Sequence, residues 1–81
     1  MKELFISFSI LLMACSEKKI SASEVPASVT AAFNTKYPNA TDVEWEQETK
    51  KAKVIYEAEF KFNGKEIEAE FDSTGNFIEE E

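Results

Sequence analysis

The spacing of apolar positions changes once along the chain, from a period of four to a period of two. Between Val25 and Tyr37, apolar residues recur at every fourth position, which predicts one apolar stripe on a helix. From Val43 onward, apolar and polar residues alternate, which is typical of strands with one buried face. The alternation predicts four strands, over residues 43–47, 53–62, 65–71 and 76–79.

Local signals predict where the helix begins and ends. Ser23 can cap the first turn, and Pro26 fits within that turn because its missing N–H needs no partner there. Pro38 ends the helix, since the residue before a proline is disfavoured in the helical conformation. The apolar stripe around Phe33 is therefore expected to cover the apolar face of the sheet.

The sequence Glu-Ala-Glu-Phe occurs on both sides of Asn63-Gly64, a dipeptide typical of two-residue hairpin turns. Such a turn fixes the register, so that apolar residues meet on one face and glutamates meet on the other. The repeated sequence is thus explained as two strands of one hairpin. The opposed pairs include Phe60 with Ile67, Glu59 with Glu68 and Glu57 with Glu70.

The last turn is expected at residues 72–75, Asp-Ser-Thr-Gly, which fits a type I turn closed by a glycine bulge. Asp72 acts there as a turn former rather than a metal ligand. The turn would place Phe77 beside Phe71, with Phe77 facing inward and Ile78 outward. A register shift of one residue would turn Phe77 outward and Ile78 inward.

We expect an α+β fold, with one N-terminal helix packed on a four-stranded antiparallel β-meander. A four-residue loop at residues 49–52 would join the first two strands and place Trp45 opposite Tyr56 in the core. Eight large aromatic residues lie between residues 23 and 81. Their burial compensates for the small size of the domain.

Residues 1–14 have the features of an export signal, with Lys2 followed by an apolar run too short to span a bilayer. The run ends in Leu-Met-Ala-Cys, which resembles the lipobox of bacterial lipoproteins and implies cleavage before Cys15 and lipidation of that residue. The alternatives are an ordinary cleaved signal and a short membrane anchor, although a lone exported cysteine forms no internal disulfide. We therefore expect a signal at 1–14, the lipidated cysteine and a polar tether at 15–22, and one domain at 23–81, lipid-anchored in the cell envelope and facing the periplasm.

The net charge of -7 comes from 16 acidic and 9 basic residues. Phosphate groups repel such a chain, so neither nucleic acid nor anionic lipid is an expected partner. The sequence has no histidine and its only cysteine is Cys15, so it predicts no enzyme and no cofactor. Glu59 and Glu68 are spaced like a glycosidase pair, but an open sheet has no cleft to create the raised-pKa acid.

The stretches "FNTKYP", "NATDVEW", "YEAEFKFNGKEIEAEFD" and "STGNF" resemble the PepSY-like domain, also described as β-lactamase-inhibitor-like. The resemblance covers nearly all of the predicted domain and implies a helix on a four-stranded sheet, exported and without catalytic residues. In duplicated relatives that inhibit β-lactamases the partner lies against the open sheet, and for other relatives inhibition of peptidases is proposed. This chain has one copy, so no inhibitory residue is carried over, although an edge-to-edge homodimer would recreate the doubled surface.

Alternate strand positions gather carboxylates on the outer face of the predicted sheet, where like charges directly opposite each other cost stability. Three explanations remain open: a merely solvated face, a docking surface for a basic envelope protein, and a loose site for Ca²⁺ or a similar cation. We expect a non-catalytic protein-binding domain, inhibitory or regulatory, with a cation-responsive envelope module as the alternative. The candidate binding face consists of Glu44, Glu46, Ile55, Glu57, Glu59, Lys61, Glu66, Glu68 and Glu70.

Overall fold

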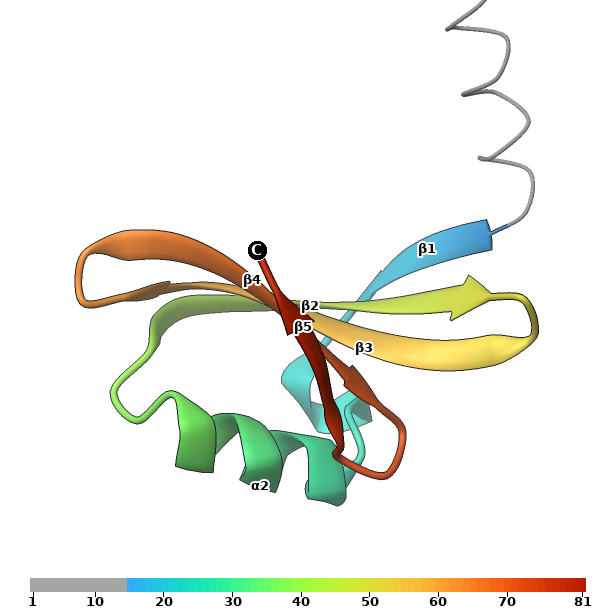
Figure 1. The fold of residues 1–81 in the computed structure, drawn as a ribbon, viewed down its shortest axis with the longest axis horizontal. Coiled ribbons are helices and arrows are strands. Elements are labelled where there is room, and N and C mark those ends of the chain that lie inside the picture. Colours follow the sequence, from blue (N-terminus) through green and yellow to red (C-terminus); the bar gives the residue numbers. More distant parts are fainter. Residues whose placement is uncertain (1–14) are drawn as a thin grey trace, which may run out of the picture.

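The computed structural model describes residues 15–81 as one helix packed on one face of an antiparallel sheet (Figure 1). The five strands are neighbours in chain order, and α2 lies across the face that we call the inner face. The α+β class is therefore confirmed, whereas the predicted signal at 1–14 lies outside the described residues. The elements are β1 (Cys15–Ile20), the short helix η1 (Ala22–Glu24), α2 (Ala27–Lys36), β2 (Thr41–Lys50), β3 (Lys53–Phe62), β4 (Lys65–Asp72) and β5 (Phe77–Glu80).

The first strand, β1, corrects two predictions. The segment 15–22 was expected to be a tether, and the helix was expected to precede all strands, but β1 pairs antiparallel with β2 over its whole length. Ile20 lies opposite Trp45 and packs against the core, which anchors the end of the strand. The pairing also satisfies backbone groups along an edge that β2 would otherwise leave open. The sheet thus has five strands instead of four.

The helix α2 begins later than its capping signals suggested. Ser23 does not cap it; the turn before it is η1, where the Ser21 N–H donates a hydrogen bond to Glu24 Oε1 (2.9 Å). Pro26 occupies the position before the helix rather than its first turn. At the other end, the Tyr37 N–H donates to the Phe33 carbonyl (2.8 Å) directly before Pro38, so the predicted stop is confirmed.

The core lies between α2 and the inner face, and its centre is aromatic. The Phe33 ring contacts four other rings, with centroid distances from 4.9 to 6.4 Å. Trp45 is buried, as predicted, but its ring contacts Phe33 and not Tyr56. The buried apolar residues are Val25, Val29, Phe33, Tyr37, Trp45, Tyr56, Ala58, Phe60, Ala69 and Phe71.

The two long hairpins differ in how well their register was predicted. Between β3 and β4 the register is the one that a two-residue turn at Asn63-Gly64 requires. Between β2 and β3 the predicted four-residue loop is wrong: the turn has two residues, Lys51 and Ala52, both with positive φ (50° and 67°). The register therefore moves by two residues, which leaves every side chain on its predicted face.

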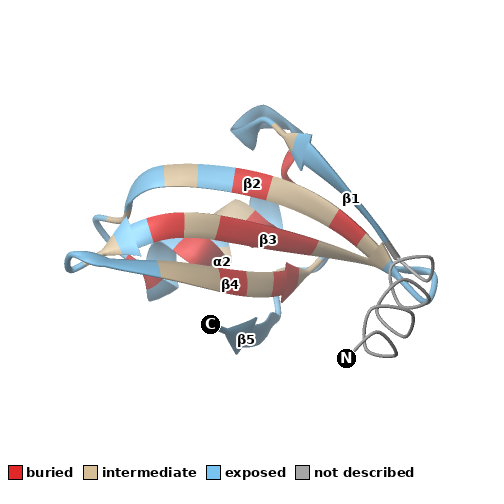
Figure 2. Ribbon diagram, turned by 90° about the horizontal axis from the view of Figure 1, so that it is seen from above, coloured by how far each residue is buried: buried red, intermediate tan, exposed pale blue. Residues whose placement is uncertain are grey.

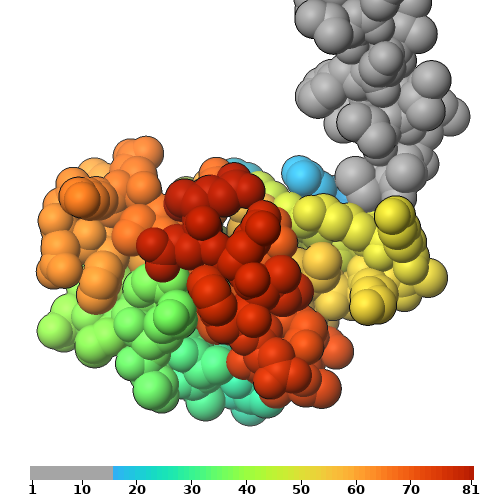
Figure 3. Space-filling model, in the orientation of Figure 1, coloured from blue at the N-terminus to red at the C-terminus, as the bar shows by residue number. Residues whose placement is uncertain are grey.

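The final turn follows the prediction. Asp72 Oδ1 accepts hydrogen bonds from the backbone N–H groups of Thr74 and Asn76, both at 2.9 Å. Phe77 lies opposite Phe71, next to a register shift in the β4–β5 ladder, and their ring centroids are 5.8 Å apart. Phe77 thus belongs to the inner side, although 42% of it is exposed, because β5 lies at the molecular surface (Figure 3).

The turn before β5 also explains why a glycine occupies position 75. Gly75 has φ +96°, and a Cβ built there would lie 2.6 Å from the Ser28 carbonyl oxygen in α2. We expect Gly75→Ala to lower the free energy of unfolding by about 1–3 kcal/mol, measured by urea denaturation. Gly64→Ala is the matched control, because Gly64 also has positive φ (+81°) but nothing within 4 Å. Equal losses in both variants would show that the contact with Ser28 is unimportant.

Candidate functional site

The outer face of the sheet is the one turned away from α2, which lies behind the sheet in Figure 2. The alternation of side chains along the strands places the predicted carboxylates on this face. The ladders place Glu59 opposite both Glu44 and Glu68, and Glu57 opposite both Glu46 and Glu70. The strands thus bring the predicted glutamates together as adjacent rows. Ile55, Lys61 and Glu66 lie on the same face by the alternation of side chains along β3 and β4.

Three further glutamates extend this face and were missed as members of it. Glu17 on β1 lies opposite Glu48, which alternation along β2 places on the same face as Glu46, and Glu79 on β5 lies opposite Glu70. Glu81 exchanges backbone hydrogen bonds with Glu68 (2.7 and 2.8 Å). We call the whole set the acidic outer face: Glu17, Glu44, Glu46, Glu48, Glu57, Glu59, Glu66, Glu68, Glu70, Glu79 and Glu81.

Two carboxylates at the centre of the acidic outer face are buried, although the face is opposite the core. Glu48 is 4% exposed and Glu57 is 7% exposed. Burial, together with hydrogen bonds shared with Glu48 and Glu68, raises the pKa of Glu57 to about 9. The Glu57 carboxyl group is therefore protonated at neutral pH, which removes one negative charge from the centre of the acidic outer face.

Negative charge is also unfavourable on two neighbouring carboxyl groups of this central region, those of Glu46 and Glu70. Burial raises the pKa of Glu46, and the nearby Glu17 and Glu59 charges raise it further. Burial likewise raises the pKa of Glu70, against a lowering effect of the Lys50 ammonium group. The centre of the acidic outer face thus holds carboxyl groups that are costly to keep charged together.

Cations are found mainly around the edge of this face. Lys19 Nζ lies 3.7 Å from a Glu44 oxygen, and Lys61 Nζ lies 3.6 Å from an Asp42 oxygen. All four of these side chains are at least half exposed, so the ion pairs contribute little to stability. They leave most of the negative potential of the acidic outer face in place.

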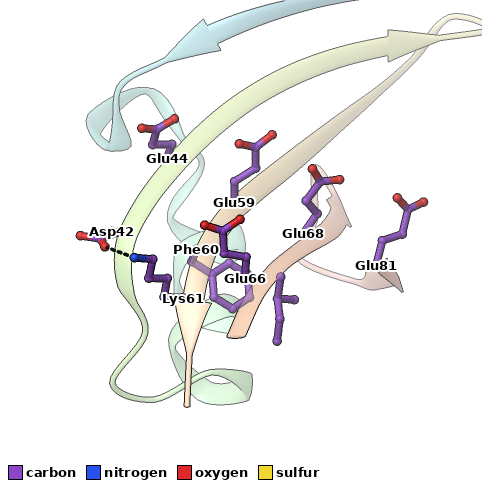
Figure 4. Close-up of a pocket in the computed structure, with 9 residues that line it drawn as sticks. Asp42, Glu44, Glu59, Phe60, Lys61, Glu66, Glu68 and Glu81 are labelled. Atoms are coloured by element: carbon purple, nitrogen blue, oxygen red, sulfur yellow. Dashed lines mark ion pairs between the residues drawn. The ribbon is translucent and has the colours of Figure 1, made fainter. Parts of the chain in front are cut away.

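At one end of the acidic outer face lies an open hollow of about 520 Å³ (Figure 4). In Figure 4 the carboxylates of Glu44, Glu59 and Glu68 are directed to the same side, and the Phe60 ring lies below them. Phe60 and Ile67 also border the hollow, but their side chains belong to the inner face and pack in or against the core. The carboxylates around the hollow suit the cationic head of a lysine or arginine side chain.

Comparisons of this chain with protein-family models, with curated proteins and with solved structures found no match. Within residues 15–81, no helix is both long and apolar enough to cross a membrane.

Proposed function

We propose that this protein is a lipid-anchored envelope protein with a non-catalytic domain that docks a basic protein partner on its acidic outer face. The observation that carries the proposal is the excess of glutamates over lysines on one face, with glutamates on all five strands of the sheet. Negative potential over such an area attracts a partner with a basic surface and orients it during encounter.

The acidic outer face lowers the stability of the domain, and this cost supports the proposal. Glu59 lies between Glu44 and Glu68 on neighbouring strands, and like charges directly opposite each other destabilise a sheet. Alternation with polar, uncharged residues would serve a merely solvated face equally well. The hollow lined by Glu59 and Glu68 adds a shape that accepts a basic side chain.

Anchoring through Cys15 and the PepSY-like character of the domain are parts of the same proposal. A lipidated Cys15 at the start of β1 would hold the sheet close to the membrane, where an envelope partner would be met. The uncovered sheet face corresponds to the surface that the resemblance associates with partner binding. The edges at β1 and β5 are those that an edge-to-edge homodimer would use.

The test is an affinity capture with the full-length chain in a non-ionic detergent, using cell-envelope extract at low and high salt. We expect the parent to retain a basic protein that Glu59→Gln, Glu68→Gln releases and that high salt elutes. Glu24→Gln is the control, because Glu24 is an exposed glutamate of η1, away from this face. Purified partner should then bind the face variant at least several-fold more weakly than the control. Equal retention by both variants would rule out docking on the acidic outer face.

A further inference from the structure

Three carboxylates from three strands converge at the centre of the acidic outer face. Glu57 on β3 lies directly opposite Glu70 on β4, and Glu48 on β2 lies diagonally beside Glu57. One carboxylate oxygen from each lies within 4.8 Å of the other two. We call Glu48, Glu57 and Glu70 the central triad.

The spacing within the central triad suits a hard divalent cation. Calcium binds oxygen ligands at about 2.3–2.6 Å, so two ligands on opposite sides of one ion are roughly 5 Å apart and adjacent ligands are closer. A single ion can therefore reach one oxygen of each glutamate. The donors are all oxygens, which favours Ca²⁺ or Mg²⁺ over metals that prefer nitrogen or sulfur.

A second observation, at Glu48, also fits a bound cation. Its side chain is 5% exposed, and its Oε1 atom is buried without a hydrogen bond. Lys50 Nζ lies 3.4 Å from that oxygen and 3.7 Å from a Glu70 oxygen, within ion-pair range but without hydrogen-bond geometry to Glu48 Oε1. A buried carboxylate oxygen without a hydrogen bond costs free energy, which an ion at this point would recover.

The neighbouring residues could complete the coordination of an ion. Glu46 belongs to two further groups of three carboxylates, one with Glu17 and Glu48 and one with Glu57 and Glu59. The side chain of Lys50 is 45% exposed, so it can move aside when a divalent ion arrives. Glu68 belongs to none of these groups of described residues.

We propose that Glu48, Glu57 and Glu70 bind a divalent cation of the Ca²⁺ class at the centre of the acidic outer face. The ion would replace the proton that Glu57 carries, and that proton would be released to solvent. Water would fill the remaining positions, and the affinity would lie in the ~10⁻⁴–10⁻³ M range of extracellular calcium modules. This inference does not depend on partner docking, because the capture variant changes Glu59 and Glu68 and leaves the central triad intact.

The test is a titration of the full-length chain in non-ionic detergent with CaCl₂, and separately with MgCl₂, by isothermal calorimetry at constant ionic strength. We expect saturable binding of one ion and a rise in melting temperature that added NaCl does not reproduce. Glu48→Gln, Glu70→Gln should weaken Ca²⁺ binding at least about tenfold, since it removes two charged ligands.

The matched control is Glu44→Gln, Glu66→Gln, which removes the same charge from exposed positions of the same face and should leave the Ca²⁺ affinity within about twofold. If both double variants weaken binding equally, the effect is general screening and the site is refuted. Absence of saturable binding by the parent would refute it too. If circular dichroism shows that the double variant does not fold, Glu48→Gln alone is the milder substitution to use in its place.

Discussion

Phe33→Ala should lower the free energy of unfolding by about 3–5 kcal/mol, the range for removing a fully packed aromatic ring from a core. Phe33 is 4% exposed and lies at the centre of the ring cluster that joins α2 to the sheet. Domains of this size have only about 5–15 kcal/mol of stability in total, usually near the lower end. The variant is therefore expected to be largely unfolded at modest urea concentrations.

The comparison for this prediction is Phe77→Ala, measured by urea denaturation with Trp45 fluorescence as the probe. Phe77 also contacts another ring, that of Phe71, but it is 42% exposed, so its loss should cost about 1 kcal/mol. Similar losses in the two variants would mean that the core is not centred on Phe33. A melting temperature unchanged by Phe33→Ala would lead to the same conclusion.

The strongest periodic signals in the sequence predicted the structure correctly. The four-residue spacing from Val25 to Tyr37 gave the buried stripe of the helix, and Asn63-Gly64 gave the β3–β4 register. Both signals are local, because a helix period and a turn dipeptide act within a few residues. The same is true of the Asp72 turn, whose hydrogen bonds stay within four residues.

Elements that depend on distant contacts were missed. Residues 16–20 contain only one apolar side chain, Ile20, so they show no strand period; β1 forms because β2 offers it an edge. The Lys51-Ala52 turn lacks the glycine or asparagine that usually indicates positive φ. Its two residues were therefore assigned to a longer loop.

The sequence predicts which glutamates lie on the outer face of the sheet, but it does not predict which of them are buried. Alternation decides which face each glutamate takes, and a register error of two residues does not change it. The burial of Glu48 and Glu57 depends on neighbours from several strands, including Glu17 on the unpredicted β1. The convergence of Glu48, Glu57 and Glu70 from three strands therefore does not follow from the alternation alone.

The free energy of unfolding should fall as pH rises. Carboxylates that are paired with cations usually have the opposite effect. The ordinary pKa of Glu57 is 4.5, and in the folded state burial and hydrogen bonding raise it to about 9. Between these values the folded protein keeps a proton that the unfolded chain releases, so folding is favoured at the lower pH. This contribution is complete below pH 4.5 and is lost as pH rises toward 9. The groups around Glu57 are carboxyls, Glu46, Glu48, Glu68 and Glu70, with Lys50 the nearby cation.

Glu57→Gln is expected to stabilise the protein at pH 8 by about 1–3 kcal/mol, because a neutral amide keeps a hydrogen-bond donor and takes up no proton on folding. The variant should also lose most of the pH slope. The measurement is urea denaturation from pH 5 to pH 9 in the presence of a chelator, so that protons alone bind the carboxyl groups.

Glu66→Gln is the control, since Glu66 lies on the same face but is exposed, and its pH profile should follow that of the parent. A Glu57→Gln protein with the slope of the parent would show that another group binds the proton. A parent whose stability rises steadily from pH 5 to pH 9 would show that Glu57 is charged in the folded state. In that case the acidic outer face would carry one more negative charge at its centre than a protonated Glu57 leaves there, and the attraction of a basic partner would be stronger.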